Sequence, residues 1–377
     1  MRLHYVHKYN KRIIWVIRIV VFIFIAVICF GCMRLYQIKK KNEEKYYSGI
    51  IDSLSCYLPG IICWGDSLTV GSGGGGINYP ATIQKLLQEK LLAGLPGNVP
   101  IPEVLNMGVG GEDTNTILGR NGAVPFIVSA DFVIPSDTIP VNIEFQSSNG
   151  KAVAPLRQGK TGIEWVRING ISGTINIEQE FYANDEYAYT FTRSVCGNPV
   201  EVASGTPIVT SGSTVGTNYL TVIFIGENGG YDTYEELIDQ QRAIINYQTA
   251  NNDRFIIVGL HTGTASERAG LEKAMVDEYG DKYINLREYM AAQGMADAGL
   301  ECTDEDQEMI AEGMTPASLM IDDKCHFNSD GYRLIGNLIY NRMDELGYYN
   351  EVKEAINTKA ERRQNYEDGR TEQKIQF

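Results

Sequence analysis

Ser67 is the residue whose surroundings point most directly to chemistry. It lies in residues 63–69 (Cys-Trp-Gly-Asp-Ser-Leu-Thr), just after a short apolar run, and Gly65 permits a sharp turn before it. A serine hydroxyl becomes a nucleophile when a histidine takes its proton, a carboxylate orients that histidine, and hydrogen-bond donors stabilise the oxyanion. Taken alone, Gly-Asp-Ser favours a simpler structure, a turn in which Asp66 or Ser67 caps the next element. The interpretation therefore depends on whether suitable partners exist.

Histidine is scarce, which narrows the choice of base. The chain has four, and His4 and His7 precede an apolar N-terminal segment, which leaves His261 and His326. Asp323 stands three residues before His326, on an expected loop where both side chains can converge on one site. Its carboxylate could accept from one imidazole nitrogen and leave the other to face the serine.

Simpler interpretations remain open for these residues. Asp322 and Asp323 would then be solvated loop charges, and His326 a residue at the start of a helix. His261 follows a strand-like run in residues 259–262 (Gly-Leu-His-Thr) and could line the cleft. We expect it to be a neighbour of the site or a satisfied polar residue, and not the base.

Two other patterns were tested for cofactor or metal chemistry. Residues 71–76 contain G-x-G-x-x-G, but the preceding strand is expected to end near Trp64 and the next helix to begin near Tyr79, whereas phosphates need the glycines at the helix start. We interpret this run as a flexible rim beside the nucleophile. The body has no paired CxxC motifs that would form a structural zinc site, and we expect no cofactor and no metal. Cys302 and Cys325 could form a disulfide outside the cell.

The elements that must position these residues alternate between two types. Apolar, strand-like runs cover residues 60–64, 103–107, 219–225, 254–260 and 283–286. Helical spacing covers residues 79–92, 234–247, 265–279 and 331–346. Strands alternating with helices imply parallel pairing and a sheet covered on both faces, which is an α/β fold of three α/β/α layers. Ligands of such sheets bind beyond the carboxyl ends of the strands, where Ser67 is expected.

The texture changes between residues 122 and 216. Residues 141–145, 165–169 and 187–191 alternate with period two and are separated by Gly, Ser, Asn and Pro clusters. This pattern predicts an inserted antiparallel β-rich domain, because the α/β pattern needs segments from both sides of it. Its aromatic residues could stack on sugar rings, but we expect most of them to be core. They are Phe145, Trp165, Phe181, Tyr182, Tyr187 and Tyr189.

Four segments resemble, in order, sequence blocks of the SGNH (GDSL-type) hydrolase superfamily. Residues 65–68 (Gly-Asp-Ser-Leu) are similar to the first block, and residues 106–114 (Asn-Met-Gly-Val-Gly-Gly-Glu-Asp-Thr) to the second. Residues 226–229 (Gly-Glu-Asn-Gly) resemble the third block, and residues 323–326 (Asp-Lys-Cys-His) match the fifth. The similarity extends over about residues 61–345 without the insertion, and it implies a flavodoxin-like sheet.

The resemblance also implies a mechanism. Ser67 attacks an ester carbonyl, His326 takes and later returns the proton, and Asp323 orients His326. The N–H groups of Ser67 and Gly111, with the Asn228 side-chain amide, form the oxyanion hole. No metal or cofactor is implied.

Two positions depart from the family pattern. Gly229 stands where the third block has Asp, and we expect this change to be tolerated because Asn228 is the implied donor. Phe327 stands where Pro often follows the histidine of the fifth block. We expect Phe327 to alter the loop and not the chemistry.

The N-terminus predicts a membrane anchor. Residues 13–31 are almost wholly apolar, with Arg18 as the one interruption, and they follow a basic stretch. A spanning helix needs about twenty such residues, and basic flanks stay in the cytoplasm. We expect an uncleaved signal-anchor in the cytoplasmic membrane, with a single-pass topology and an extracellular catalytic domain. A cleaved signal peptide and a lipoprotein modified at Cys32 are the alternatives, although residues 29–31 (Cys-Phe-Gly) fit a lipobox poorly.

Charge divides the chain in the same region. Residues 1–45 carry a net charge of +8 and the whole chain −14, which leaves −22 for residues 46–377. A body this acidic does not seek nucleic acid or anionic lipid by charge. We therefore expect a soluble ectodomain with no nucleic-acid partner.

Together these patterns predict six segments and one activity. The segments are a basic flank with a signal-anchor helix (1–32), a stalk (33–58), the two parts of the hydrolase core (59–121 and 217–349), the β-rich insertion (122–216) and a charged tail (350–377). We expect an acetyl- or short-acyl-esterase that acts on extracellular or cell-envelope carbohydrate. Its substrate is then an acylated small molecule or glycan. A lipase- or lysophospholipase-like esterase, and a non-catalytic glycan-binding or adhesin module that uses the insertion, are the alternatives.

Overall fold

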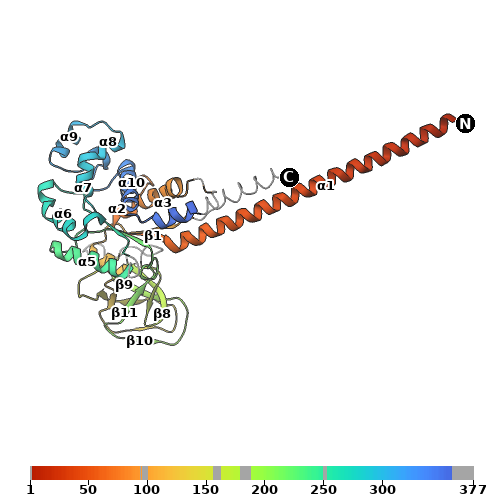
Figure 1. Ribbon diagram of the computed structural model, residues 1–377. Helices are drawn as coiled ribbons and strands as arrows, with labels where there is room; N and C mark the ends of the chain where they lie inside the picture. The colour runs from red at the N-terminus through yellow and green to blue at the C-terminus, as the bar shows by residue number, and fades with distance from the viewer. Residues whose placement is uncertain are drawn as a thin grey trace. The chain divides into compact units, whose positions relative to one another are not determined.

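A computed structural model describes residues 2–93, 95, 101–155, 163–178, 188–248 and 253–358 (Figure 1). The chain divides into two compact units, of which Leu54–Glu354 is the larger. This larger unit contains Ser67, His261 and His326, and is called the body below. The smaller unit contains most of helix α1 (Arg2–Tyr57).

Helix α1 continues well beyond the apolar run. Residues 33–58 were predicted as a polar stalk. All but the last residue of this segment belong to α1. This segment holds helix-favouring Lys, Glu, Leu and Ile residues, and the chain has no proline before Pro59, where a helix cannot easily continue. Within the described residues, α1 is the helix long and apolar enough to cross a membrane, over Trp15–Gly49.

The body contains, within its described ranges, one sheet of five parallel strands, as the alternation predicted. The strands are β1 (Gly60–Gly65), β2 (Glu103–Gly108), β12 (Leu220–Phe224), β13 (Phe255–Val258) and β14 (Tyr283–Ile284). Their order in space is β14-β13-β12-β1-β2. This is the doubly wound order 2-1-3-4-5, which places a crevice between β1 and β12, outside their carboxyl ends.

Helices cover both faces of this sheet. They are α3 (Tyr79–Leu86), α4 (Thr114–Asn121), α5 (Tyr234–Gln248), α6 (Ala265–Tyr279) and α10 (Ser329–Glu345). Successive side chains of a strand face opposite layers. Ile62 and Trp64 of β1 pack in one cluster with residues of α4, α5 and α6. On the other face the Tyr79 ring lies 6.3 Å from the Phe224 ring, and α10 packs on α3 where Gly336 meets Thr82.

Shorter helical elements complete the body. They are α2 (Ser67–Val70), α7 (Leu286–Tyr289), α8 (Met295–Ala298), α9 (Asp304–Ala311), π-helical turns at Leu87–Leu91 and Met290–Gly294, and 3-10 turns at Gly212–Thr214, Gly280–Lys282 and Ala317–Leu319. The sequence analysis did not anticipate α4 or the helices between β14 and α10. Of the charged tail, residues 350–358 are helical and the remainder lies outside the described residues.

Residues between α4 and β12 form separate antiparallel sheets, as predicted. The strands are β3 (Phe126–Val128), β4 (Phe132–Ile134), β5 (Val141–Ile143), β6 (Phe145–Ser147), β7 (Val166–Ile168), β8 (Ile171–Glu178), β9 (Ala188–Arg193), β10 (Val200–Val202) and β11 (Pro207–Thr210). Among the described residues of the insertion, seven strands take the order β5-β9-β8-β7-β11-β3-β6, and β10 pairs with β4. The insertion has its own apolar core.

One expectation about the insertion needs correction. Residues 141–145 were predicted as one strand, but the strand is interrupted at Glu144. The two resulting strands, β5 and β6, lie at opposite edges of the sheet. The Phe145 ring packs 4.7 Å from the Tyr189 ring, whereas Trp165 is 44% exposed. Phe181, Tyr182 and Tyr187 lie outside the described residues.

The central strand gives a stability prediction. Ile223 of β12 is fully buried in the same cluster as Trp64. We expect Ile223→Ala to lower the free energy of unfolding by about 2–5 kcal/mol, because it removes apolar contacts and leaves a cavity. Urea denaturation of the full-length protein in detergent, followed by tryptophan fluorescence, measures this.

Val209 provides the control for this prediction, since it is 40% exposed on β11. Val209→Ala should change the free energy of unfolding by no more than about 0.5 kcal/mol. Equal effects of the two substitutions would contradict the placement of Ile223 in the core.

Candidate active site

The turn after β1 places Ser67 at the carboxyl edge of the parallel sheet. Ser67 is the first residue of α2, and Asp66 caps this helix by accepting a hydrogen bond from the Leu68 N–H at 2.9 Å. Of the two residues considered as a cap, Asp66 is the one that caps the helix. The Ser67 hydroxyl is left for another partner.

That partner is His326, which lies 259 residues away in sequence. Its Nε2 is 2.8 Å from Ser67 Oγ, and its Nδ1 is 2.6 Å from Asp323 Oδ2. An ionised carboxylate can only accept a hydrogen bond, so Nδ1 carries the hydrogen and donates it to Asp323. Nε2 can then accept a hydrogen bond from the serine hydroxyl. The three side chains have the connectivity of a Ser-His-Asp triad.

Backbone hydrogen bonds fix the loop that carries Asp323 and His326. Asp323 Oδ1 accepts from the N–H groups of Cys325 and His326, both at 2.9 Å. Burial raises the pKa of Asp323, but these N–H groups and the His326 ring together outweigh burial and lower the pKa to about 2. Asp323 therefore stays ionised at neutral pH. Lys324 between them adopts a left-handed conformation, with φ of 54°.

The proposed oxyanion donors lie on the loops after β1, β2 and β12. Gly111 is exposed and has φ of 81°, a conformation that favours glycine. No group in the described residues accepts a hydrogen bond from the N–H of Ser67 or Gly111. The Asn228 amide already has two acceptors, the Asp66 carboxylate at 3.3 Å and the Glu112 carbonyl at 3.1 Å.

Asp66 is a site residue that the motif analysis treated only as a cap. Burial raises its pKa to about 7, and the nearby charge of Glu227 adds to this, against the opposing effect of the Leu68 N–H. Asp66 also holds the Asn228 amide. The only sequence signal for this role is its position beside the nucleophile.

Glu227, next to Asn228, was also missed. It accepts from the His261 N–H and from the Thr262 hydroxyl, both at 2.7 Å. Burial raises the pKa of Glu227, but the nearby His261 and these donors reverse this and lower it below its ordinary value. This buried carboxylate ties the loop after β12 to the loop after β13.

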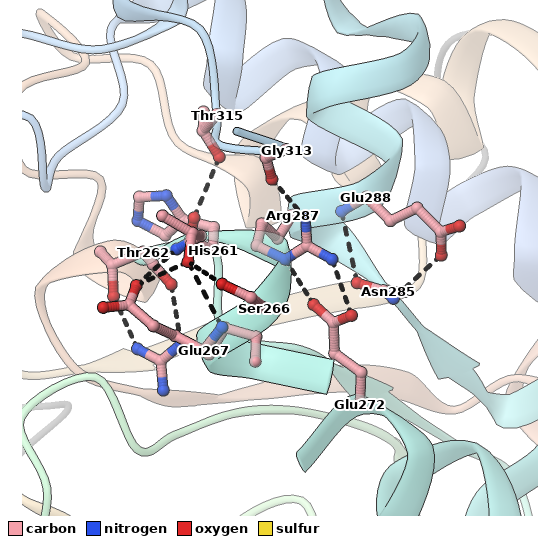
Figure 2. Close-up of polar contacts among 12 residues, drawn as sticks. His261, Thr262, Ser266, Glu267, Glu272, Asn285, Arg287, Glu288, Gly313 and Thr315 are labelled. Atoms are coloured by element: carbon pink, nitrogen blue, oxygen red, sulfur yellow. Dashed lines mark hydrogen bonds and ion pairs between the residues drawn. The ribbon is translucent and has the colours of Figure 1, made fainter. Parts of the chain in front are cut away.

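The His261 ring lies beside the loop of Asp323 and His326 and makes no hydrogen bond to Ser67. The ring is buried and packs in a tilted arrangement against the Phe327 ring, with centroids 4.2 Å apart. Neither ring nitrogen makes a hydrogen bond of normal geometry to a described residue. Of the two roles expected for His261, the structure therefore supports that of a neighbour of the site. Burial lowers the pKa of His261. Its carbonyl accepts from the Thr315 hydroxyl (Figure 2).

The glycine-rich run borders the triad. The Tyr332 hydroxyl donates to the Ser72 carbonyl at 2.7 Å, and a side chain at Gly73 would meet the Phe327 carbonyl at 2.9 Å. This half of the run is packed and hydrogen-bonded, which corrects the prediction of a flexible rim, whereas Gly75 and Gly76 face open space.

The remaining cysteine and metal predictions concern other residues. Cys302 and Cys325, considered for a disulfide, are both free thiols. In the described ranges, no group of three or more His, Cys, Asp and Glu side chains is placed to hold a metal ion.

The triad geometry predicts the effect of neutralising its acid. Asp323→Asn should lower kcat for an ester roughly 10⁴-fold, because an amide no longer favours the tautomer with hydrogen on Nδ1. Steady-state kinetics on the full-length protein measures this. Asp322→Asn, at the adjacent exposed carboxylate, is the matched control and should retain wild-type kcat. A small effect at Asp323 would remove it from the triad.

The raised pKa of Asp66 predicts a pH-dependent stability difference. The folded protein holds this proton more tightly than the unfolded chain, so its contribution to stability is full below pH 3.8 and is lost as the pH rises to about 7. In Asp66→Asn that loss cannot occur. The unfolding free energy of the variant minus that of the wild type should therefore increase from pH 4 to pH 7 and then level off.

Urea titrations of both proteins at four pH values between 4 and 8 measure this difference. A difference that does not vary with pH would mean that Asp66 is ionised in the folded protein throughout this range.

Likeness to known proteins does not identify this arrangement. No protein-family model, no curated protein and no solved structure matches the chain. A function can therefore be inferred from the geometry at the edge of the parallel sheet and from the motifs that lie there.

Proposed function

We propose that the protein is a serine ester hydrolase of the SGNH (GDSL) type. The observation that carries this proposal is the continuous contact from Ser67 Oγ to His326 Nε2 and from His326 Nδ1 to Asp323, at 2.8 and 2.6 Å. The contact lies where the strand order of the sheet reverses, which is where doubly wound folds bind ligands.

The mechanism follows from the roles of these groups. Ser67 Oγ attacks the ester carbonyl while His326 Nε2 takes its proton, and Asp323 stabilises the imidazolium. The N–H groups of Ser67 and Gly111 stabilise the oxyanion, and the Asn228 amide joins them by exchanging its 3.3 Å contact with the Asp66 carboxylate for the oxyanion. Collapse releases the alcohol, which takes the proton from His326. Water, deprotonated by His326, then cleaves the acyl-serine to release the acid and restore Ser67.

The family assignment is supported by where the motifs lie. The first-block segment begins at the last residue of β1, the second spans the end of β2 and the loop after it, the third follows β12 and the fifth precedes α10. Each segment therefore contributes to the same edge of the parallel sheet. Phe327, which replaces a proline of the family pattern, is buried and packs against His261, so the substitution fills space behind the catalytic loop.

The proposed substrate is a carbohydrate that carries acetyl or other short acyl groups outside the cell. Its support is the apolar helix α1, the acidic body and the family resemblance. We propose a single-pass anchor with the body outside the cytoplasmic membrane.

Ester turnover tests the activity. The full-length protein in detergent should hydrolyse p-nitrophenyl acetate, and Ser67→Ala should lose roughly 10⁶-fold in kcat, as when a nucleophilic serine is removed elsewhere. A fluorophosphonate should label the wild type and not the variant, as mass spectrometry of the intact chain can show.

Equal background rates in the two proteins would exclude the hydrolase and leave the glycan-binding module. Faster turnover of p-nitrophenyl octanoate than of the acetate would favour a lipase-like esterase. A panel of acetylated glycans then identifies the natural ester.

A further inference from the structure

A buried ion pair lies directly behind the proposed oxyanion hole. Arg120 Nε donates to Glu112 Oε2 at 2.8 Å, and both side chains are fully buried. Withdrawing two charges from water costs about as much as their attraction returns, so a buried pair is weak evidence for stability. The position of the pair suggests another role.

Glu112 connects two of the proposed donors. It directly follows Gly111 in the chain, and its carbonyl accepts the hydrogen bond from the Asn228 amide at 3.1 Å. Fixing the Glu112 side chain therefore restrains two groups. One is the peptide bond between Gly111 and Glu112, and the other is the Glu112 carbonyl, which accepts the hydrogen bond from Asn228.

Arg120 extends this restraint to the nucleophile. Its guanidinium lies over the Trp64 ring, 5.2 Å from the ring centroid, and its Nη2 approaches the Gly65 carbonyl at 3.4 Å. Gly65 ends β1, two residues before Ser67. One guanidinium thus contacts the loop of the oxyanion hole and the strand that presents the nucleophile.

The insertion is hydrogen-bonded to and packed against α4, the helix that carries Arg120. The buried Thr210 hydroxyl, at the end of β11, donates to the Arg120 carbonyl at 2.7 Å. Gly119 faces the Phe126 ring of β3 so closely that an added Cβ would lie 1.9 Å from it. The helix that carries Arg120 is therefore held by the insertion from outside.

We propose that Glu112 and Arg120 are positioning residues of the oxyanion hole, and that the insertion holds them in place through Thr210. This inference rests on the proposed esterase function. Neither side chain touches the substrate; both act by fixing the peptide after Gly111 and the Asn228 amide. A displacement of about 1 Å in such groups can cost 10²-fold in rate.

Binding of a tetrahedral adduct separates this role from a structural one. Phenylboronic acid forms a tetrahedral anion on an active serine, so its affinity reports the oxyanion hole. In full-length Arg120→Met, we expect kcat for p-nitrophenyl acetate to fall about 10²-fold. The affinity for phenylboronic acid should fall by the same factor, while KM changes less than about threefold.

Two further variants distinguish a loss of positioning from a loss of folding. The double variant Glu112→Gln with Arg120→Met leaves no buried charge unpaired, and such replacements often keep stability. Its unfolding midpoint should approach the wild-type value while kcat and boronate affinity stay low. Thr210→Val, which is similar in shape, should lower both quantities in parallel by about tenfold.

The matched control is the ion pair of Arg287 with Glu272, drawn in Figure 2. Arg287 is 4% exposed, joins α7 to α6 and donates to the Gly313 carbonyl. Arg287→Met should destabilise the protein while kcat per labelled serine and boronate affinity stay at wild-type values.

The outcomes distinguish the two proposals. Wild-type turnover that depends on Ser67, together with unchanged kcat and boronate affinity in Arg120→Met and the double variant, overturns the positioning role alone. Loss of activity without loss of boronate affinity overturns it as well. Absence of Ser67-dependent turnover in the wild type overturns both proposals.

Discussion

The parallel pairing of β1 with both of its neighbours is the constraint on which the site depends. Gly65, the last residue of β1, pairs with Gly108 of β2 and with Phe224 of β12. The three strands therefore end at one level, and the loops that carry Ser67 and the proposed oxyanion donors begin together. A slip of one residue would move a loop by about 3.3 Å and turn its side chains to the other face. The close fit needs glycine, since a Cβ at Gly108 would lie 2.3 Å from the Val70 nitrogen.

Three buried carboxylates lie around this edge, and they have different hydrogen-bond partners. Glu112 is paired with Arg120, and Glu227 accepts from several N–H and hydroxyl donors. Asp66 has weaker support, from one backbone N–H and the Asn228 amide at 3.3 Å. Burial therefore dominates at Asp66 and its pKa rises to about 7. The carboxylate whose charge varies near neutral pH is thus the one beside the nucleophile and the proposed amide donor.

The local elements were predictable because their signals are local. Strand-like apolar runs ended within two residues of the observed parallel strands, and the Asp-x-x-His spacing placed Asp323 and His326 on one loop. The approach of Ser67 to His326 follows from the strand order, which periodicity does not encode. Glu112 and Arg120 are eight residues apart, outside the helical three- and four-residue spacings, and Arg120 has the sequence appearance of an exposed helix residue. The break at Glu144 depends on which strands are available for pairing.

The path of the insertion bears on whether it is part of the site or a separate module. The insertion leaves the core after α4, and α4 runs away from the catalytic edge because it begins just after β2. The Ala154 N–H nevertheless bonds Thr116 in the first turn of α4 at 3.1 Å, and Lys151 pairs with Glu236 in the first turn of α5 at 3.0 Å. The insertion therefore returns along α4 to the catalytic edge. A module joined only at its entry and exit would avoid the entropy cost of ordering these contacts. Their presence beside the loops of Gly111 and Asn228 is explained if the insertion helps to hold those loops.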